Sequence, residues 1–210
     1  MSQDDNRRPI AARNTGWAQR LSATLARSSI TPNQISVLSI FFAAIGAAML
    51  AWVPTVGGLV LAAACIQLRL VCNLLDGMVA MEGGRKTATG ALYNEFPDRV
   101  ADSLLIVALG YACGLSWLGW LGALLAALTA YVRLAGGSLG LAQDFRGPMA
   151  KQHRMAVLTV ACVIAAVERW LHGTHWSLLA AAVVIAVGAL LTCITRSAGI
   201  ARQLNDKDAA

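Results

Sequence analysis

Residues 57–80 read GGLVLAAACIQLRLVCNLLDGMVA, an apolar run that ends in a polar cluster. A run of about 20 mostly apolar residues is long enough to cross the hydrocarbon core of a bilayer as a helix. The last turns of this run carry Asn73, Asp76 and Gly77. Because a charged side chain inside a membrane segment costs at least a few kcal/mol, Asp76 is expected to serve a function.

The composition places most of the 210-residue chain in lipid. Hydrophobic residues make up 57% of it and charged residues only 13%, whereas a water-soluble domain has about 25% charged residues. The five cysteines are scattered singly, as small buried hydrophobes and not as disulfides or a zinc site. We therefore expect an all-α integral membrane protein with six transmembrane helices near residues 35–54, 57–80, 91–113, 117–139, 155–171 and 176–195.

The distribution of Lys and Arg predicts the orientation of these helices. Basic residues precede the first run, lie between the second and third and between the fourth and fifth, and follow the last. The connections near 54–56 and 114–116 have none. By the positive-inside rule both termini face the cytoplasm, in an inner (cytoplasmic) membrane. The net charge of +6 suits an anionic inner leaflet and requires no nucleic acid partner.

The chain divides into a basic N-terminal region (1–34), a membrane domain (35–200) and a cytoplasmic tail (201–210), whose last residues, NDKDAA, we expect to be disordered. The first 34 residues are too polar for a secretory signal peptide. Residues 14–28 place Trp17, Leu21 and Leu25 on one helical face, which is typical of an interfacial amphipathic helix; a plain basic tail is the alternative. Thr31 and Pro32 then predict a helix start.

Two polar faces flank the short connection at residues 81–90, MEGGRKTATG. The preceding helix carries one of them, made of Asn73, Asp76, Gly77 and Ala80. The following helix repeats polar residues every four positions and so places on one face Asn94, Asp98 and Asp102. Two antiparallel helices would bring the faces together at cytoplasmic depth.

These facing oxygen atoms predict a site for a hard cation. Carboxylate and amide oxygens suit Mg²⁺ or Mn²⁺, and magnesium is usually held by a few carboxylates together with phosphate. The alternative is that the polar residues cap the turn or pair with Arg85, Lys86 and Arg99. Cations at the same leaflet level would hold phosphate oxygens, and the candidates are Arg133, Lys151 and Arg154; ordinary positive-inside topology is the alternative for them.

The pattern resembles the signature of the CDP-alcohol phosphatidyltransferases, D-x-x-D-G-x-x-A-R-(x)8-G-x-x-x-D-x-x-x-D. Residues that match in identity and spacing are Asp76, Gly77, Ala80, Gly90 and Asp98. Asn73 and Asn94 replace two signature aspartates and Met81 replaces the arginine, which suggests a divergent subgroup. A second register ends in Asp98 and Asp102 but puts Asn94 at the signature glycine. The six spans and the residues before the first span also fit, so the resemblance covers most of the chain.

The resemblance implies a divalent-metal-dependent phosphotransferase of phospholipid biosynthesis. It would move a phosphatidyl group from a CDP-linked lipid, such as CDP-diacylglycerol, to a polar alcohol or alcohol phosphate and release CMP. The implied metal ligands are Asn73, Asp76, Asn94 and Asp98, and Asp98 is the implied catalytic base. Nucleotide contacts are implied at Asp76, Gly77, Ala80 and Gly90, acceptor or phosphate contacts at Arg133, Lys151 and Arg154, and compensating acids at Glu95 and Asp102. The family also suggests a homodimer.

Two other functions are compatible with the sequence. A membrane protein of the same fold that binds CDP-lipid without turnover would account for the two lost charges. A small transporter would use intramembrane acids as relays, but it would need them near the bilayer midplane, whereas these acids cluster at one face.

Overall fold

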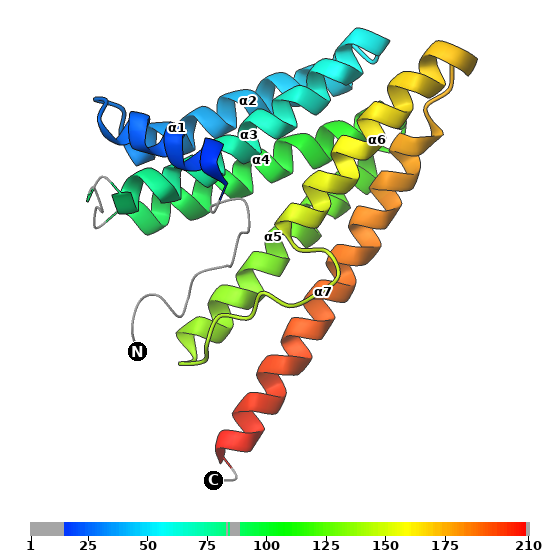
Figure 1. Ribbon diagram of the computed structural model, residues 1–210. Coiled ribbons are helices and arrows are strands. Elements are labelled where there is room, and N and C mark those ends of the chain that lie inside the picture. Colours follow the sequence, from blue (N-terminus) through cyan, green and yellow to red (C-terminus); the bar gives the residue numbers. More distant parts are fainter. Residues whose placement is uncertain (1–14, 83, 85–88, 209–210) are drawn as a thin grey trace.

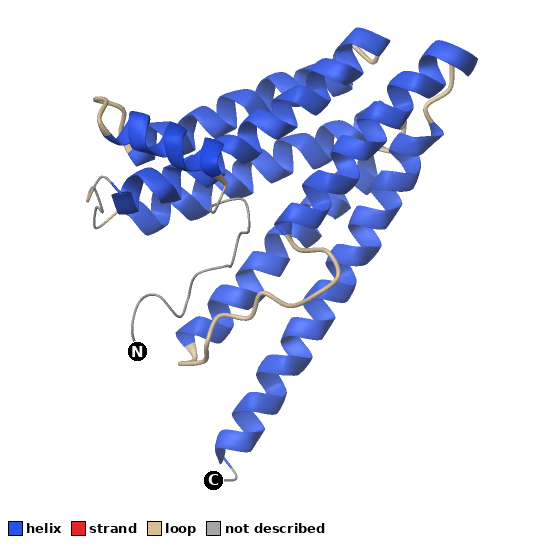
Figure 2. Cartoon of the chain, in the orientation of Figure 1, coloured by secondary structure: helices blue, strands red, loops and turns tan. Residues whose placement is uncertain are grey.

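The computed structural model describes residues 15–82, 84 and 89–208, which form helices joined by loops (Figures 1 and 2). The helices are α1 (Gly16–Ala26), α2 (Pro32–Trp52), α3 (Val56–Glu82), α4 (Gly90–Ala112), α5 (Ser116–Ser138), α6 (Lys151–His172) and α7 (Trp176–Asp208). This agrees with the predicted all-α class. Residues 1–14 of the predicted N-terminal region, and Arg85 and Lys86, lie outside the described residues.

Six of these helices close into a ring. Around it, α2 packs on α4, α4 on α5, α5 on α7, α7 on α6, α6 on α3, and α3 back on α2, while α1 lies against α3 (Figure 1). Helices α3 and α4 are consecutive in the chain but touch only sparsely, and α2 packs against both. The polar faces of α3 and α4 are therefore free to line a cavity instead of packing on each other.

Five helices are long and apolar enough to cross a membrane, namely α2, α3, α5, α6 and α7. The chain is thus a multi-pass membrane protein. Helix α4 has 23 residues, enough for a hydrocarbon core of about 30 Å at roughly 1.5 Å per residue. Its first half carries several charged residues, so composition alone does not identify it as a span, and the sixth span stays a prediction.

Local sequence explains where α2 begins. The Thr31 side chain accepts a hydrogen bond from the Gln34 backbone (3.2 Å), and the Gln34 side chain accepts one from the Thr31 backbone (2.9 Å). This reciprocal capping box satisfies backbone donors that the first turn leaves open. Pro32 occupies the first helical position, where its missing N–H costs nothing. The predicted start is confirmed.

The last helix is longer than predicted. We expected it to end near residue 195 and residues 205–210 to be disordered, but α7 continues to Asp208. The extension packs against α5, because a Cβ at Gly136 would lie only 2.9 Å from Cδ1 of Ile200. Lys207 Nζ also donates to the Gly140 carbonyl (3.2 Å). Close helix packing thus carries the helix past its apolar part.

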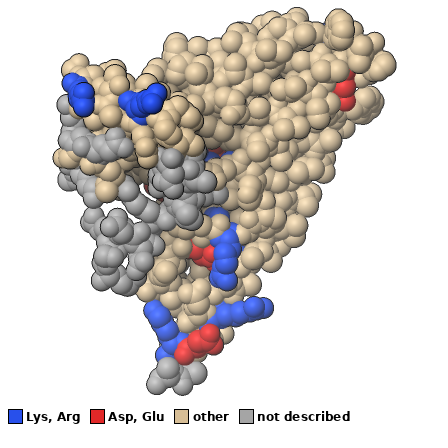
Figure 3. Space-filling view, viewed as in Figure 1, with Lys and Arg blue, Asp and Glu red and all other residues tan. Residues whose placement is uncertain are grey.

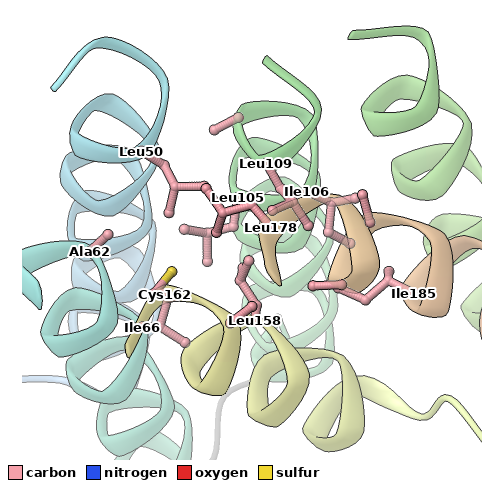
Figure 4. Packing of buried hydrophobic residues seen from close by; sticks show 14 of the residues in the cluster. Leu50, Ala62, Ile66, Leu105, Ile106, Leu109, Leu158, Cys162, Leu178 and Ile185 are labelled. Carbon is pink, nitrogen blue, oxygen red and sulfur yellow. The ribbon is translucent and has the colours of Figure 1, made fainter. Parts of the chain in front are cut away.

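Apolar side chains fill the half of the ring remote from the α3–α4 connection (Figure 4). Leu50, Leu105, Leu109, Leu158 and Ile185 are almost fully buried there. Since lipid tails are as apolar as leucine, van der Waals packing is what holds such a core together in a membrane. The other half of the ring is left for the polar residues.

The outer surface divides in the same way. Figure 3 shows a largely uncharged helical flank, with charged side chains near α1 and near the C-terminal end of α7. Large apolar side chains such as Phe41, Trp117 and Trp170 are exposed on the helices, as lipid-facing residues are. Helix α1 buries Ala18 against α3 and exposes Trp17 and Leu21; its position in the membrane interface stays a prediction.

Candidate active site

A cavity of about 630 Å³ opens between α1, α3, α4, α5, α6 and α7, beside the α3–α4 connection. It gathers most of the residues that the sequence singled out. Those that line it are Asn73, Asp76, Gly77, Asn94, Glu95, Asp98, Arg133, Lys151 and Arg154. Ala80, Gly90 and Asp102 are described but lie outside the lining, so the structure does not bring them to the cavity wall.

Asp76 is held by neutral donors. The Ser36 hydroxyl of α2 donates to Oδ2 (2.6 Å), and the Gly77 backbone N–H donates to Oδ1 (2.5 Å). The residue is 6% exposed. Among the described residues, no Lys, Arg or His lies within ion-pair distance of its carboxylate. Asp76 is thus a buried acid without an ion-pair partner among the described residues, and Lys151, which contacts Asp98, acts on it only from beyond ion-pair distance.

Asp98 is surrounded by cations. Lys151 Nζ of α6 contacts Oδ2, and Arg99 Nη2 lies 3.9 Å from the same oxygen. Arg69 Nη2 of α3 lies 3.6 Å from Oδ1 and 3.4 Å from the backbone carbonyl. Both carboxylate oxygens therefore already face a positive charge.

A buried ion triad lies directly behind the cavity. Arg69 Nη2 donates to Asp102 Oδ1 (2.5 Å), and Arg154 Nη2 donates to Asp102 Oδ2 (2.8 Å). Arg154 Nη1 also donates to the Met149 carbonyl (2.8 Å). The Arg69, Asp102 and Arg154 side chains are at most 3% exposed. Asp102, a candidate compensating acid, thus serves as the anchor of two arginines.

The other candidate compensating acid is also paired. Glu95 Oε1 accepts from Arg133 (2.6 Å), and Oε2 accepts from Arg99 (3.1 Å). Arg133 further contacts the Gln143 side chain and lies over the Phe145 ring, 5.2 Å from its centroid. Each predicted phosphate-binding cation, Arg133 included, therefore contacts a carboxylate.

Sequence reasoning missed three residues. Arg69 lies inside the apolar run of α3, and its charge at that depth was the available signal. Ser36 touches Asp76 from another helix, and no local pattern announces it. Arg196 of α7 lines the cavity and donates to the Thr129 (2.6 Å) and Arg146 (2.8 Å) carbonyls; the sequence had indicated only a topological role for it.

The residues present fit one hard divalent ion. In the described part of the chain no three His, Cys, Asp or Glu side chains gather into a metal site, whereas Asn73 and Asn94 bring amide oxygens to the cavity. The Asn73 Nδ2 atom is buried without a hydrogen-bond partner, and such an orphan is costly. Rotating this amide by half a turn exchanges Nδ2 and Oδ1 and would turn the unpaired donor into an acceptor that a cation could satisfy. Asp76, Asn73 and Asn94 then offer the oxygen ligands that Mg²⁺ and Mn²⁺ accept.

A family model for CDP-alcohol phosphatidyltransferase matches residues 29–194. The chain belongs to this family. The predicted family is thus confirmed, and the matched region contains α2 to α6, most of α7 and almost all of the cavity lining. As a CDP-alcohol phosphatidyltransferase, the chain transfers a phosphatidyl group from a CDP-linked lipid in phospholipid synthesis.

Named relatives agree with this family. The chain is 28% identical to a phosphatidylinositol phosphate synthase of Streptomyces avermitilis over 197 residues, which cover 90% of this chain and 80% of the relative. It is 33% identical to an archaetidylinositol phosphate synthase of Aeropyrum pernix over 150 residues, 70% of this chain and 74% of the relative.

Solved structures share the fold. The Mycobacterium tuberculosis phosphatidylinositol phosphate synthase crystallised with CDP-DAG bound has a TM-score of 0.71 at 19% identity, covering 87% of this chain and 92% of that chain. The same enzyme in complex with manganese and citrate also has a TM-score of 0.71 at 19% identity, covering 87% and 88%.

Proposed function

We propose that the cavity is the active site of a phosphatidyltransferase in which asparagines hold two of the four signature positions. The observation that carries this proposal is that Asn73, Asp76, Asn94 and Asp98 line one cavity. The donor is CDP-diacylglycerol, whose diphosphate lies at the polar cluster while its acyl chains stay in the bilayer. The CDP-DAG bound to the mycobacterial relative supports this choice.

In the reaction, the acceptor hydroxyl attacks the phosphorus nearest the lipid. The new bond joins the acceptor oxygen to that phosphorus, the bond to the bridging oxygen breaks, and CMP leaves with the electron pair. Asp98 takes the acceptor proton as general base. Lys151 and Arg69, which face its two oxygens, fix the orientation of this carboxylate.

Asn73, Asp76 and Asn94 would hold one Mg²⁺ or Mn²⁺ ion, with Asp98 beside them. A divalent ion there would neutralise the diphosphate and make CMP a better leaving group. Asp76 and Gly77 contact the nucleotide phosphates at the cavity wall. Ala80 and Gly90 do not line the cavity, so their role toward the nucleotide is to shape the backbone of α3 and α4 next to it.

The acceptor is a polar alcohol or its phosphate. Relatives named for inositol phosphate products support a phosphorylated acceptor. Arg133, Lys151 and Arg154 bind the acceptor or its phosphate, and each contacts a carboxylate. Lys151 has three N–H donors and can keep its contact with Asp98 while it binds phosphate, whereas Arg133 has to exchange its partner. Glu95 is the most exposed of the three acids, with a side chain 30% exposed, so its ion pair with Arg133 is the easiest to break.

The proposed setting is an inner membrane, with six spans, both termini and the cavity at the cytoplasmic face, and a homodimer as the functional unit. Helix α1 lies in the membrane interface, and its exposed Trp17 and Leu21 support this. The basic residues at the cavity end of the helices and their absence from the α2–α3 and α4–α5 turns support the orientation.

The test is CMP release by purified protein in detergent with CDP-diacylglycerol, Mg²⁺ or Mn²⁺, and a panel of polar alcohols and their phosphates. Metal-dependent CMP release with one acceptor is the expected result. If no acceptor gives CMP release while CDP-diacylglycerol still raises the melting temperature, the protein binds the donor without turning it over.

A further inference from the structure

The two acids of the signature have opposite electrostatic surroundings. Asp98 contacts Lys151 and lies 3.6 Å from Arg69 and 3.9 Å from Arg99. Asp76 accepts hydrogen bonds from the Ser36 hydroxyl and the Gly77 backbone N–H, and no cation of the described residues lies within ion-pair distance of it. Among the described residues, Asp98 therefore has direct ion-pair partners and Asp76 has none.

The cations at Asp98 are fixed parts of the fold. The Arg69 side chain is fully buried and is also bonded to Asp102 (2.5 Å). Lys151 begins α6 and its side chain is 18% exposed. A divalent ion ligated by Asp98 would have to displace this ammonium group and approach a buried guanidinium, and like charges in a poorly solvated site repel strongly.

The signature positions of this chain also carry few negative charges. Asn73 and Asn94 leave the four signature positions with the charges of Asp76 and Asp98 alone. Because Lys151 already matches the charge of Asp98, Asp76 is the one signature acid left for a divalent ion, and two ions would place four positive charges against a single carboxylate.

We propose that the Lys151 ammonium group occupies the position of a second metal ion beside Asp98. Arg69, which contacts the same carboxylate, helps to hold it there. The site then binds a single divalent ion, on the Asp76 side. This inference rests on the proposed function, since it presumes that a metal binds near Asp76. It gives Lys151 a role that sequence spacing did not indicate, because α6 is distant in sequence from both polar faces.

The experiment measures Mn²⁺ bound to the full-length protein in detergent, with equilibrium dialysis for stoichiometry and electron paramagnetic resonance for magnetic coupling between ions. The wild type should bind about one ion per chain and show the spectrum of an isolated Mn²⁺. The Asn73→Asp/Asn94→Asp variant, which restores the acids but keeps Lys151, should still bind one. Adding Lys151→Met to that variant should raise the stoichiometry to about two, with a coupled spectrum.

The outcomes separate the two proposals. Two coupled ions in the wild type would overturn the role of Lys151 while leaving a metal-dependent enzyme. No bound ion in the wild type would overturn both. A second ion in Asn73→Asp/Asn94→Asp with Lys151 retained would show that the missing acids alone limit the stoichiometry and would also overturn it. The wild type and the Asn73→Asp/Asn94→Asp variant together decide even where the triple variant fails to fold.

Discussion

At the scale of single residues, the site depends on contacts between helices that are far apart in sequence. Asp98 and Asp102 lie one turn apart on α4, yet Asp98 lines the cavity while Asp102 lies behind it and pairs with Arg69 and Arg154. From their spacing in the sequence, both acids were candidates for metal ligands. Spacing gives the face of a helix, but it does not tell which position on that face meets a buried arginine from another helix.

Replacing Arg69 with methionine should destabilise the protein. The substitution leaves Asp102 and Asp98 buried with one partner fewer, and breaking a buried ion pair from one side costs about 3–5 kcal/mol. Thermal unfolding in detergent should show a clearly lower melting temperature. Arg202→Met, on the exposed C-terminal part of α7, is the matched control and should change little; equal shifts in both variants would contradict the structural role of Arg69.

Replacing Ser36 with alanine should weaken metal binding more than it weakens the fold. Its hydroxyl donates to Asp76 Oδ2, and loss of such an outer contact typically lowers metal affinity about 10–100-fold. Mn²⁺ titration of the purified protein measures this. Ser39→Ala is the control, since the Ser39 hydroxyl donates to the Ser36 carbonyl (2.6 Å) and not to Asp76. Unchanged affinity in Ser36→Ala would argue against Asp76 as a ligand.

At the scale of elements, apolar runs located the helices to within a few residues, because membrane thickness fixes their length and Thr31 and Pro32 mark the first start. The end of α7 was not predictable in this way. Its last turns are polar and resemble a tail, and the contacts of Ile200 with Gly136 and of Lys207 with the Gly140 carbonyl explain the helix there.

Replacing Gly110 with alanine should loosen the contact between α4 and α5. The added Cβ would lie 2.5 Å from the Gly119 Cα, a backbone atom that no side-chain rotation can move away. We expect a lower melting temperature in detergent. Gly57→Ala, in the first turns of α3 with nothing within 4 Å of the added Cβ, is the control and should be neutral or slightly stabilising.

At the scale of the whole molecule, the ring of helices has the polar cavity at one end and the apolar core at the other. Composition predicted a membrane protein and the signature predicted its family, since both are patterns within the sequence. The ring itself was not predicted, because it depends on α2 packing against both α3 and α4.

The orientation of this ring is open to direct labelling. Cysteines introduced at His172, in the last turn of α6, and at Asn205, near the end of α7, should lie on opposite sides of the membrane. A membrane-impermeant maleimide should label His172→Cys in right-side-out vesicles and Asn205→Cys only in inverted ones, with the parent protein as background. The reverse pattern would place the cavity at the outer face.

Turnover by Asp98→Asn, compared with the wild type in the same lipid vesicles, tests the central claim most directly. This variant keeps the size of the side chain and removes its charge, and a general base typically contributes 10²–10⁴-fold to a rate, so CMP release from CDP-diacylglycerol should fall by about that factor. CDP-diacylglycerol should still raise the melting temperature of the variant, which shows that the fold and the donor site persist. CMP release at the wild-type rate in Asp98→Asn would contradict the assignment of this cavity as the catalytic site.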